Sequence, residues 1–187
     1  MTKRQMSDLQ IRRMTYSALY LAIAMILPFL TGQIPQIGAM LSPMHIPVLL
    51  CGFLCGPVHG MVIGFIAPIL RSFLFGMPKL YPSAIGMAFE LAAYGFFSGF
   101  LYRFFGSRKG GIYVTLILSM IIGRIVWGVA RVVLAGIAKT EFTMSLFIAG
   151  AITTAIPGII LHIVLIPVLV YMMEKAGLSL NGPKSRR

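Results

Sequence analysis

The stretch IYVTLILSMIIGRIVWGVARVVLAGIA, at residues 112–138, carries only two charged side chains, Arg124 and Arg131. A helix needs about 20 predominantly apolar residues to cross the hydrocarbon core of a bilayer, so this stretch predicts a transmembrane helix. Polar or Gly/Pro-rich segments separate it from further apolar runs. We therefore expect an all-α integral membrane protein with six transmembrane helices. Their predicted ranges are Met14–Leu30, Met44–Gly56, Val58–Phe75, Ser83–Phe105, Ile112–Ala138 and Ser145–Met173.

The composition supports a single membrane domain at residues 14–174, between a polar segment at 1–13 and a basic tail at 175–187. Of the 187 residues, 58% are hydrophobic and 11% are charged. Soluble domains average about 45–50% apolar and about 25% charged residues. A soluble fold could not cover this much apolar surface with so few charges, so the bilayer is expected to act as the solvent.

The net charge of +12 could suggest nucleic-acid binding, but the basic residues lie at the ends of apolar runs and in the tails. The excess of basic residues in cytoplasmic segments of membrane proteins explains this placement better. Only Lys79 and Lys139 lie on the side opposite the termini, so both termini are expected in the cytoplasm and loops 32–43, 76–82 and 139–144 outside. The basic residues on the side of the termini are Lys3, Arg4, Arg12, Arg13, Arg103, Arg108, Lys109, Lys175, Lys184, Arg186 and Arg187.

Four ionisable residues, Arg71, Glu90, Arg124 and Arg131, fall inside the predicted membrane helices. A charge at the centre of a bilayer costs about 2.5–3.5 kcal/mol on insertion scales, so such residues indicate functional sites. Arg124, Trp127 and Arg131 are spaced to project from one helical face. The excess of arginine over glutamate indicates an outward-facing cavity for a small carboxylate, which arginine can bind in a bidentate manner while Trp127 forms a wall.

The helix predicted at Ser83–Phe105 presents Met87, Glu90 and Tyr94 on one face. A short turn joins it to the next helix, so the two are expected to be antiparallel neighbours. Counting inward from their outer ends places Glu90 level with Arg131 and Arg124 about two turns deeper. A purely structural ion pair between Glu90 and an arginine is the alternative interpretation.

The remaining candidates are weaker. Arg71, near the outer end of its helix, could either bind ligand or extend to the membrane interface. His45 opens its helix beside the first outer loop and could reach a ligand, whereas His59 and His162 are more typical of structural residues. No metal-binding motif is present, and we expect no cofactor.

Catalytic motifs are also missing from the sequence. It contains no G-x-x-x-x-G-K-[ST] phosphate loop, no G-x-S-x-G elbow and no paired carboxylates. We therefore expect no enzyme. A lipid-modifying transferase would need an acidic or histidine cluster at the cytoplasmic interface, and a self-sufficient secondary carrier would show internal repeats or an ion-coupling site.

Several segments resemble the substrate-binding S components of energy-coupling-factor (ECF) vitamin transporters. Ala18-Leu-Tyr-Leu-Ala22 is similar to the A-x-x-x-A motif in the first helix of that family. The runs MHIPVLLCGF at 44–53, LRSFLFGMP at 70–78 and YPSAIGMAFEL at 81–91 also resemble it. The resemblance covers essentially the whole chain.

The resemblance implies a prokaryotic, multi-pass protein of the cell membrane that binds a vitamin from outside. A separate membrane scaffold subunit and two ABC-type ATPases would supply the driving force, with Ala18 and Ala22 as the small-residue surface that docks onto the scaffold. Internal packing of the two alanines is the alternative. The family builds its site from the outer halves of helices four to six and the outer loops, which Glu90, Arg124, Trp127 and Arg131 broadly satisfy. The further candidates are Gln33 and Gln36, as caps on the site, and Tyr81.

Within the family, the chain looks most like members assigned to pantothenate. Two arginines suit its carboxylate, and Glu90 could accept a hydrogen bond from a hydroxyl group. Nicotinate, biotin and lipoate also carry a carboxylate and remain alternative substrates. A self-sufficient secondary carrier remains an alternative function.

Overall fold

A computed structural model of the chain describes residues 3–31, 34, 38, 40–106, 108–139, 143–150 and 154–181. In this part of the chain all regular structure is helical. The elements in order are α1 (Lys3–Ile26), the 3-10 turn η1 (Leu27–Thr31), α3 (His45–Cys55), α4 (Pro57–Phe75), the irregular turn η2 (Leu80–Ala84), α5 (Ile85–Phe105), α6 (Gly111–Ile137), α7 (Met144–Ile148) and α8 (Ile156–Lys175).

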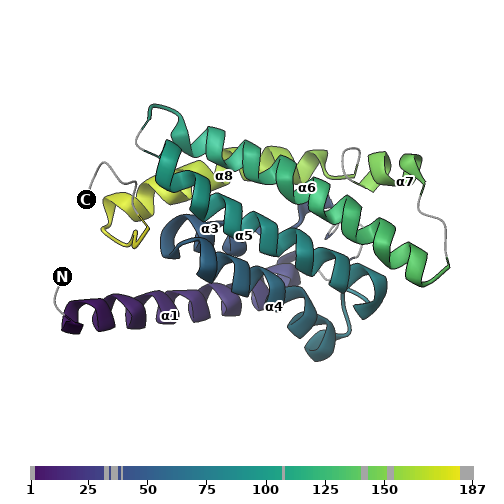
Figure 1. The fold of residues 1–187 in the computed structure, drawn as a ribbon, viewed down its shortest axis with the longest axis horizontal. Coiled ribbons are helices and arrows are strands. Elements are labelled where there is room, and N and C mark those ends of the chain that lie inside the picture. The colour runs from purple at the N-terminus through teal and green to yellow at the C-terminus, as the bar shows by residue number, and fades with distance from the viewer. Residues whose placement is uncertain are drawn as a thin grey trace.

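Among the described residues, five helical segments are long and apolar enough to cross a membrane. They are Ser7–Leu30, Pro57–Phe75, Leu80–Phe105, Gly111–Ile137 and Ile156–Lys175. The all-helical membrane fold expected from the sequence is thus confirmed. The start of α1 and the end of α8 lie at the same end of the bundle (Figure 1).

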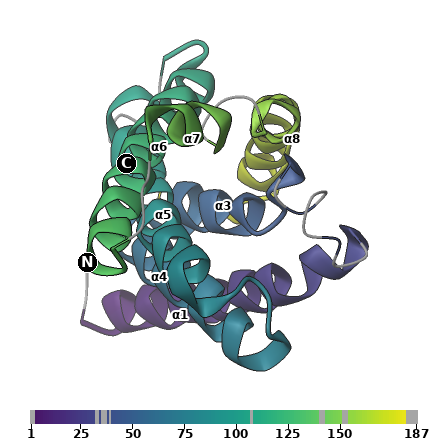
Figure 2. The same cartoon turned by 90° about the vertical axis from the view of Figure 1, so that its right-hand side faces the viewer.

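The short helix α3 forms the centre of the bundle. All of its 11 residues are buried, and it packs against α1, α4, α5 and α8. Figure 2 shows α3 between α1 and α8. Eleven residues rise only about 16 Å, roughly half of the hydrocarbon core. Both ends of α3 therefore lie within the protein and need polar partners there.

Asn181, beyond α8, supplies partners for the C-terminal end of α3. The chain turns back after Gly177, whose φ is +72°, and Asn181 is fully buried. Its Nδ2 donates to the carbonyls of Gly52 and Phe53, both at 3.3 Å, and its Oδ1 accepts a bond of 2.7 Å from Arg103 Nε. Two of the last carbonyls of α3 are thus satisfied by this side chain.

Glycine allows α3, α4 and α5 to approach closely. A Cβ atom on Gly95 of α5 would overlap the backbone of Gly60 in α4, and one on Gly64 would overlap the backbone of Leu91. Small residues at these positions permit the helix contacts that stabilise bundles in lipid. Gly60 and Gly64 of α4 and Gly95 and Gly99 of α5 each recur at a spacing of four, which places them along one face of their helix.

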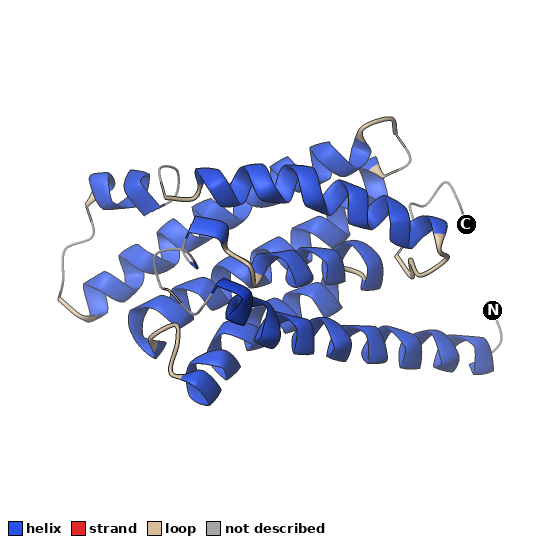
Figure 3. Ribbon diagram, turned by 180° about the vertical axis from the view of Figure 1, so that it is seen from behind, coloured by secondary structure: helices blue, strands red, loops and turns tan. Residues whose placement is uncertain are grey.

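The prediction of one continuous helix at Ser145–Met173 is wrong. The structure has the separate helices α7 and α8, with a turn at Thr154 and Ala155. Pro157 lies in the first turn of α8, where its missing N–H costs nothing, while its ring disfavours helical backbone just before it. Seen from behind, α7 stands apart from α8, and α1 runs along one edge of the bundle (Figure 3).

Candidate functional site

A buried carboxylate, Glu90 of α5, lies between residues of α3 and α6. Glu90 is 2% exposed. Its Oε1 lies 3.0 Å from Arg124 Nη1 and 3.6 Å from His45 Nε2. An unpaired carboxylate at this depth would be costly, so the guanidinium makes the buried charge tolerable. The structural ion pair considered from the sequence is present, and Arg124 is the partner.

Two further side chains complete this group. The ring of His45 lies 5.3 Å from that of Tyr94 on α5, edge to face, and 5.9 Å from that of His162 on α8, nearly parallel to it. Both partners are buried. We call His45, Glu90, Tyr94, Arg124 and His162 the polar cluster; it joins four helices at the level of the first residue of α3.

His162 is the member of the cluster that the sequence does not predict as a ligand residue. It stands alone in an apolar run, and no neighbour at helical spacing distinguishes it. Only the packing of α8 against the start of α3 brings it to His45.

The expected match of Glu90 with Arg131 is wrong. Glu90 pairs with Arg124, whereas Arg131 lies next to Gly86, one helical turn before Glu90 on α5; a Cβ on Gly86 would be 3.2 Å from Arg131 Cδ. Arg124 and Arg131 lie about two helical turns apart on α6, as expected. The tight turn after Phe105 sets the register of α5 and α6. Because α6 has 27 residues and α5 has 21, their outer ends do not match, and counting from those ends misplaces the pair.

An aromatic layer lies beside Arg131. The Arg131 guanidinium carbon is 5.9 Å from the centre of the Trp127 ring. The ring of Phe147, on α7, stacks on the Trp127 ring with 6.1 Å between the ring centres. Trp127 thus lies between Arg131 and Phe147; whether it forms a wall of the ligand site stays a prediction. Phe147 was not predicted, since the approach of α7 to α6 is a tertiary feature.

Arg71, a further predicted ligand residue, contacts the end of α1 instead of the polar cluster. Arg71 is 3% exposed; its Nη1 donates to the carbonyl of Met25, and its guanidinium carbon lies 5.0 Å from the ring centre of Phe29 and 5.1 Å from that of Phe75. These contacts hold α4 against the end of α1.

Two of the remaining candidates have structural contacts. The Tyr81 hydroxyl donates to the carbonyl of Leu134, and Met87 packs against the apolar core. Gln33 and Gln36 lie outside the described residues. Whether any of these four contacts ligand stays a prediction.

Arg124 also faces an open cavity of about 340 Å³ on the surface between α6 and α8, where Ile121 and Ile125 are 52% and 57% exposed. Its side chain is 18% exposed, in contrast to the buried cluster residues behind it. The other lining residues are apolar and include Ile121, Ile125, Phe147 and Ile163. Arg124 therefore belongs to the polar cluster on one side and to an apolar cavity on the other.

No three metal-ligating side chains gather within the described ranges.

A family model for the substrate-specific component of ECF transporters matches residues 12–170. The chain belongs to this family. It is a membrane substrate-binding subunit of an ECF transporter, a component of a transporter and not an enzyme, and the resemblance recognised in its motifs is confirmed. Searches of curated proteins and of solved structures give no match.

Membership in the S-component family implies a small-molecule substrate together with scaffold and ATPase partners. Ala18 and Ala22 lie on the exposed face of α1, whereas Ser17, Tyr20 and Ala24 are buried. The two alanines therefore do not pack against the described interior.

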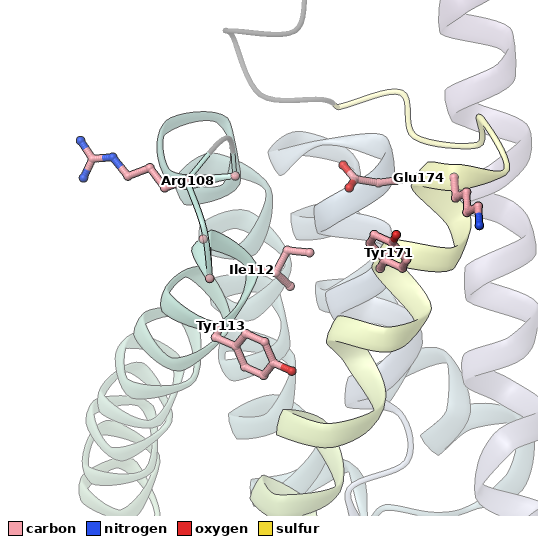
Figure 4. Close-up of a pocket in the computed structure, with 9 residues that line it drawn as sticks. Arg108, Ile112, Tyr113, Tyr171 and Glu174 are labelled. Atoms are coloured by element: carbon pink, nitrogen blue, oxygen red, sulfur yellow. The ribbon is translucent and has the colours of Figure 1, made fainter.

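A second hollow of this S component, about 440 Å³, lies at the end of the bundle that holds the termini. Tyr113 of α6 faces Tyr171 and Glu174 of α8 across it, while Arg108 extends away from it (Figure 4). None of the predicted ligand residues lines this hollow. The tyrosines are typical of a membrane interface.

Proposed function

We propose that this S component captures a small carboxylated vitamin from the outer side and passes it on after docking to the scaffold through Ala18 and Ala22. The observation that carries the proposal is Arg124, a guanidinium that faces both a buried carboxylate and a cavity. Arg131 lies about two helical turns further along the same face of α6, and arginine binds a carboxylate in a bidentate manner.

The position of the site supports capture from outside. Glu90 is the sixth residue of α5 and lies about 8 Å from its start. His45 is the first residue of α3, at its outer end under the proposed orientation. The ligand would then enter beside the first outer loop, opposite the end that holds both termini (Figure 1).

Pantothenate is the candidate that the sequence resemblance favours, and nicotinate, biotin and lipoate are the alternatives. The test is calorimetry on the detergent-purified chain with each of these acids. We expect tight binding of one acid and a loss of roughly tenfold to a hundredfold in Arg131→Ala, since hydrogen bonds to charged groups contribute about 1.5–3 kcal/mol.

Arg108→Ala is the matched control, because Arg108 is exposed and distant from the polar cluster. The Arg108→Ala variant should bind the acid as tightly as the unmodified chain does. A folded chain that binds none of the acids would refute the proposal. Solute movement into liposomes by the chain alone, without ATPases, would instead support a secondary carrier.

A further inference from the structure

The cavity beside Arg124 has an apolar lining, and the other polar side chains of the site lie outside it. Apart from Arg124, every described residue that lines it has an apolar side chain. The α6 and α8 backbones at these positions are within helices, so their amides and carbonyls are already paired. A hydroxyl or amide placed among Ile121, Ile125 and Ile163 would find no partner there.

The polar side chains of the site lie on the far side of Arg124. His45, Tyr94 and His162 have polar atoms without hydrogen-bond partners among the described residues, but they are at most 3% exposed and do not line the cavity. A ligand in the cavity therefore reaches Arg124 first. The Nε atom of Arg124 is also without a hydrogen-bond partner in this part of the chain.

We infer that the substrate is an amphipathic monocarboxylate whose anion binds Arg124 and whose apolar body fills the cavity between α6 and α8. This inference rests on the proposed function and narrows its substrate class. Phe147 lines the cavity from α7 and stacks on Trp127. Lipoate, with a hydrocarbon chain and an apolar ring, satisfies this description, whereas pantothenate would place hydroxyl and amide groups against isoleucine.

The cavity predicts two trends in affinity. Each methylene added to a straight-chain carboxylate should strengthen binding about fourfold until the cavity is full, which follows from about 0.8 kcal/mol per buried methylene. A hydroxyl without a partner should weaken binding roughly tenfold to a hundredfold. Octanoate, with two more methylenes, should therefore bind roughly fifteenfold more tightly than hexanoate, and lipoate more tightly than pantothenate.

A matched pair of variants on α8 tests where the apolar body lies. Ile163→Phe fills the cavity, whereas Ile160→Phe makes the same change on an exposed position, 58% accessible, that does not line it. Calorimetry with hexanoate, octanoate, lipoate and pantothenate is done on both variants and on the unmodified chain. Detergent takes up the longer acids equally in all three samples, so differences between variants report the cavity.

We expect the octanoate-to-hexanoate ratio to fall to about one in Ile163→Phe, with lipoate affinity reduced at least tenfold, and neither to change in Ile160→Phe. Tighter binding of pantothenate than of lipoate, unaffected by Ile163→Phe, would overturn the inference and leave the proposed function standing. Binding of no carboxylate by the folded chain would refute the proposed function itself. A co-purified phospholipid that Ile163→Phe displaces, without acid binding, would show a lipid groove and overturn the inference as well.

Discussion

Replacing Glu90 by glutamine tests whether the Glu90–Arg124 pair is a structural element of the bundle. The substitution keeps the shape of the side chain but removes the negative charge 3.0 Å from Arg124 Nη1. Removing one partner of a buried ion pair costs about 3–5 kcal/mol, because the other charge is left without compensation. The Arg124 side chain is 18% exposed and keeps some solvation. We therefore expect a loss of unfolding free energy at the lower end of this range, about 3 kcal/mol.

This loss should appear as a lower melting temperature of the purified chain in detergent. For a chain of this length 1 kcal/mol corresponds to about 2–4 °C, so Glu90→Gln should melt about 6–12 °C lower. Asp8→Asn, the same chemical change on an exposed acid of α1, is the control and should melt within about 2 °C of the unmodified chain.

The double variant Glu90→Gln/Arg124→Gln separates the pair from its parts. With both charges gone, no buried ion is left uncompensated, so the double variant should regain most of the stability that Glu90→Gln loses. The coupling between the two substitutions should exceed about 2 kcal/mol. Two small losses that simply add in the double variant would show that the pair contributes nothing, and the reasoning about a buried charge would be refuted.

Three further outcomes are expected. Ala18→Trp should leave the dissociation constant of the ligand within about twofold but reduce uptake by the complete transporter at least tenfold, because bulk blocks close helix contact; equal losses of both would refute a separate docking surface. Gly95→Leu should lower the melting temperature, since overpacking against the Gly60 backbone costs at least about 1–3 kcal/mol, whereas Gly136→Leu, with open space around it, should not. Asn181→Ala should cost about 1–3 kcal/mol of stability through unpaired carbonyls with unchanged ligand affinity; a changed affinity would show that the C-terminal end of α3 also shapes the site.

Periodicity within single helices predicted correctly which side chains share a helical face. Arg124, Trp127 and Arg131 do share one face of α6, and Glu90 and Tyr94 share one face of α5, because a helix repeats every 3.6 residues wherever it lies. The pairing across helices was misjudged, since it was counted from outer ends that do not coincide. His162 and Phe147 were missed for a related reason: each reaches the site through the placement of a different helix.

The sequence by itself determined that the chain lies in a membrane and where most of its helices begin and end. Length and apolar composition decide this, because lipid leaves a backbone few alternatives to the helix. Only the tertiary structure decided that Glu90 pairs with Arg124, that α3 is buried throughout and capped by Asn181, and that Arg124 opens onto an apolar cavity. These features depend on the register between helices, which close glycine contacts and tight turns set over distances that no local pattern in the sequence records.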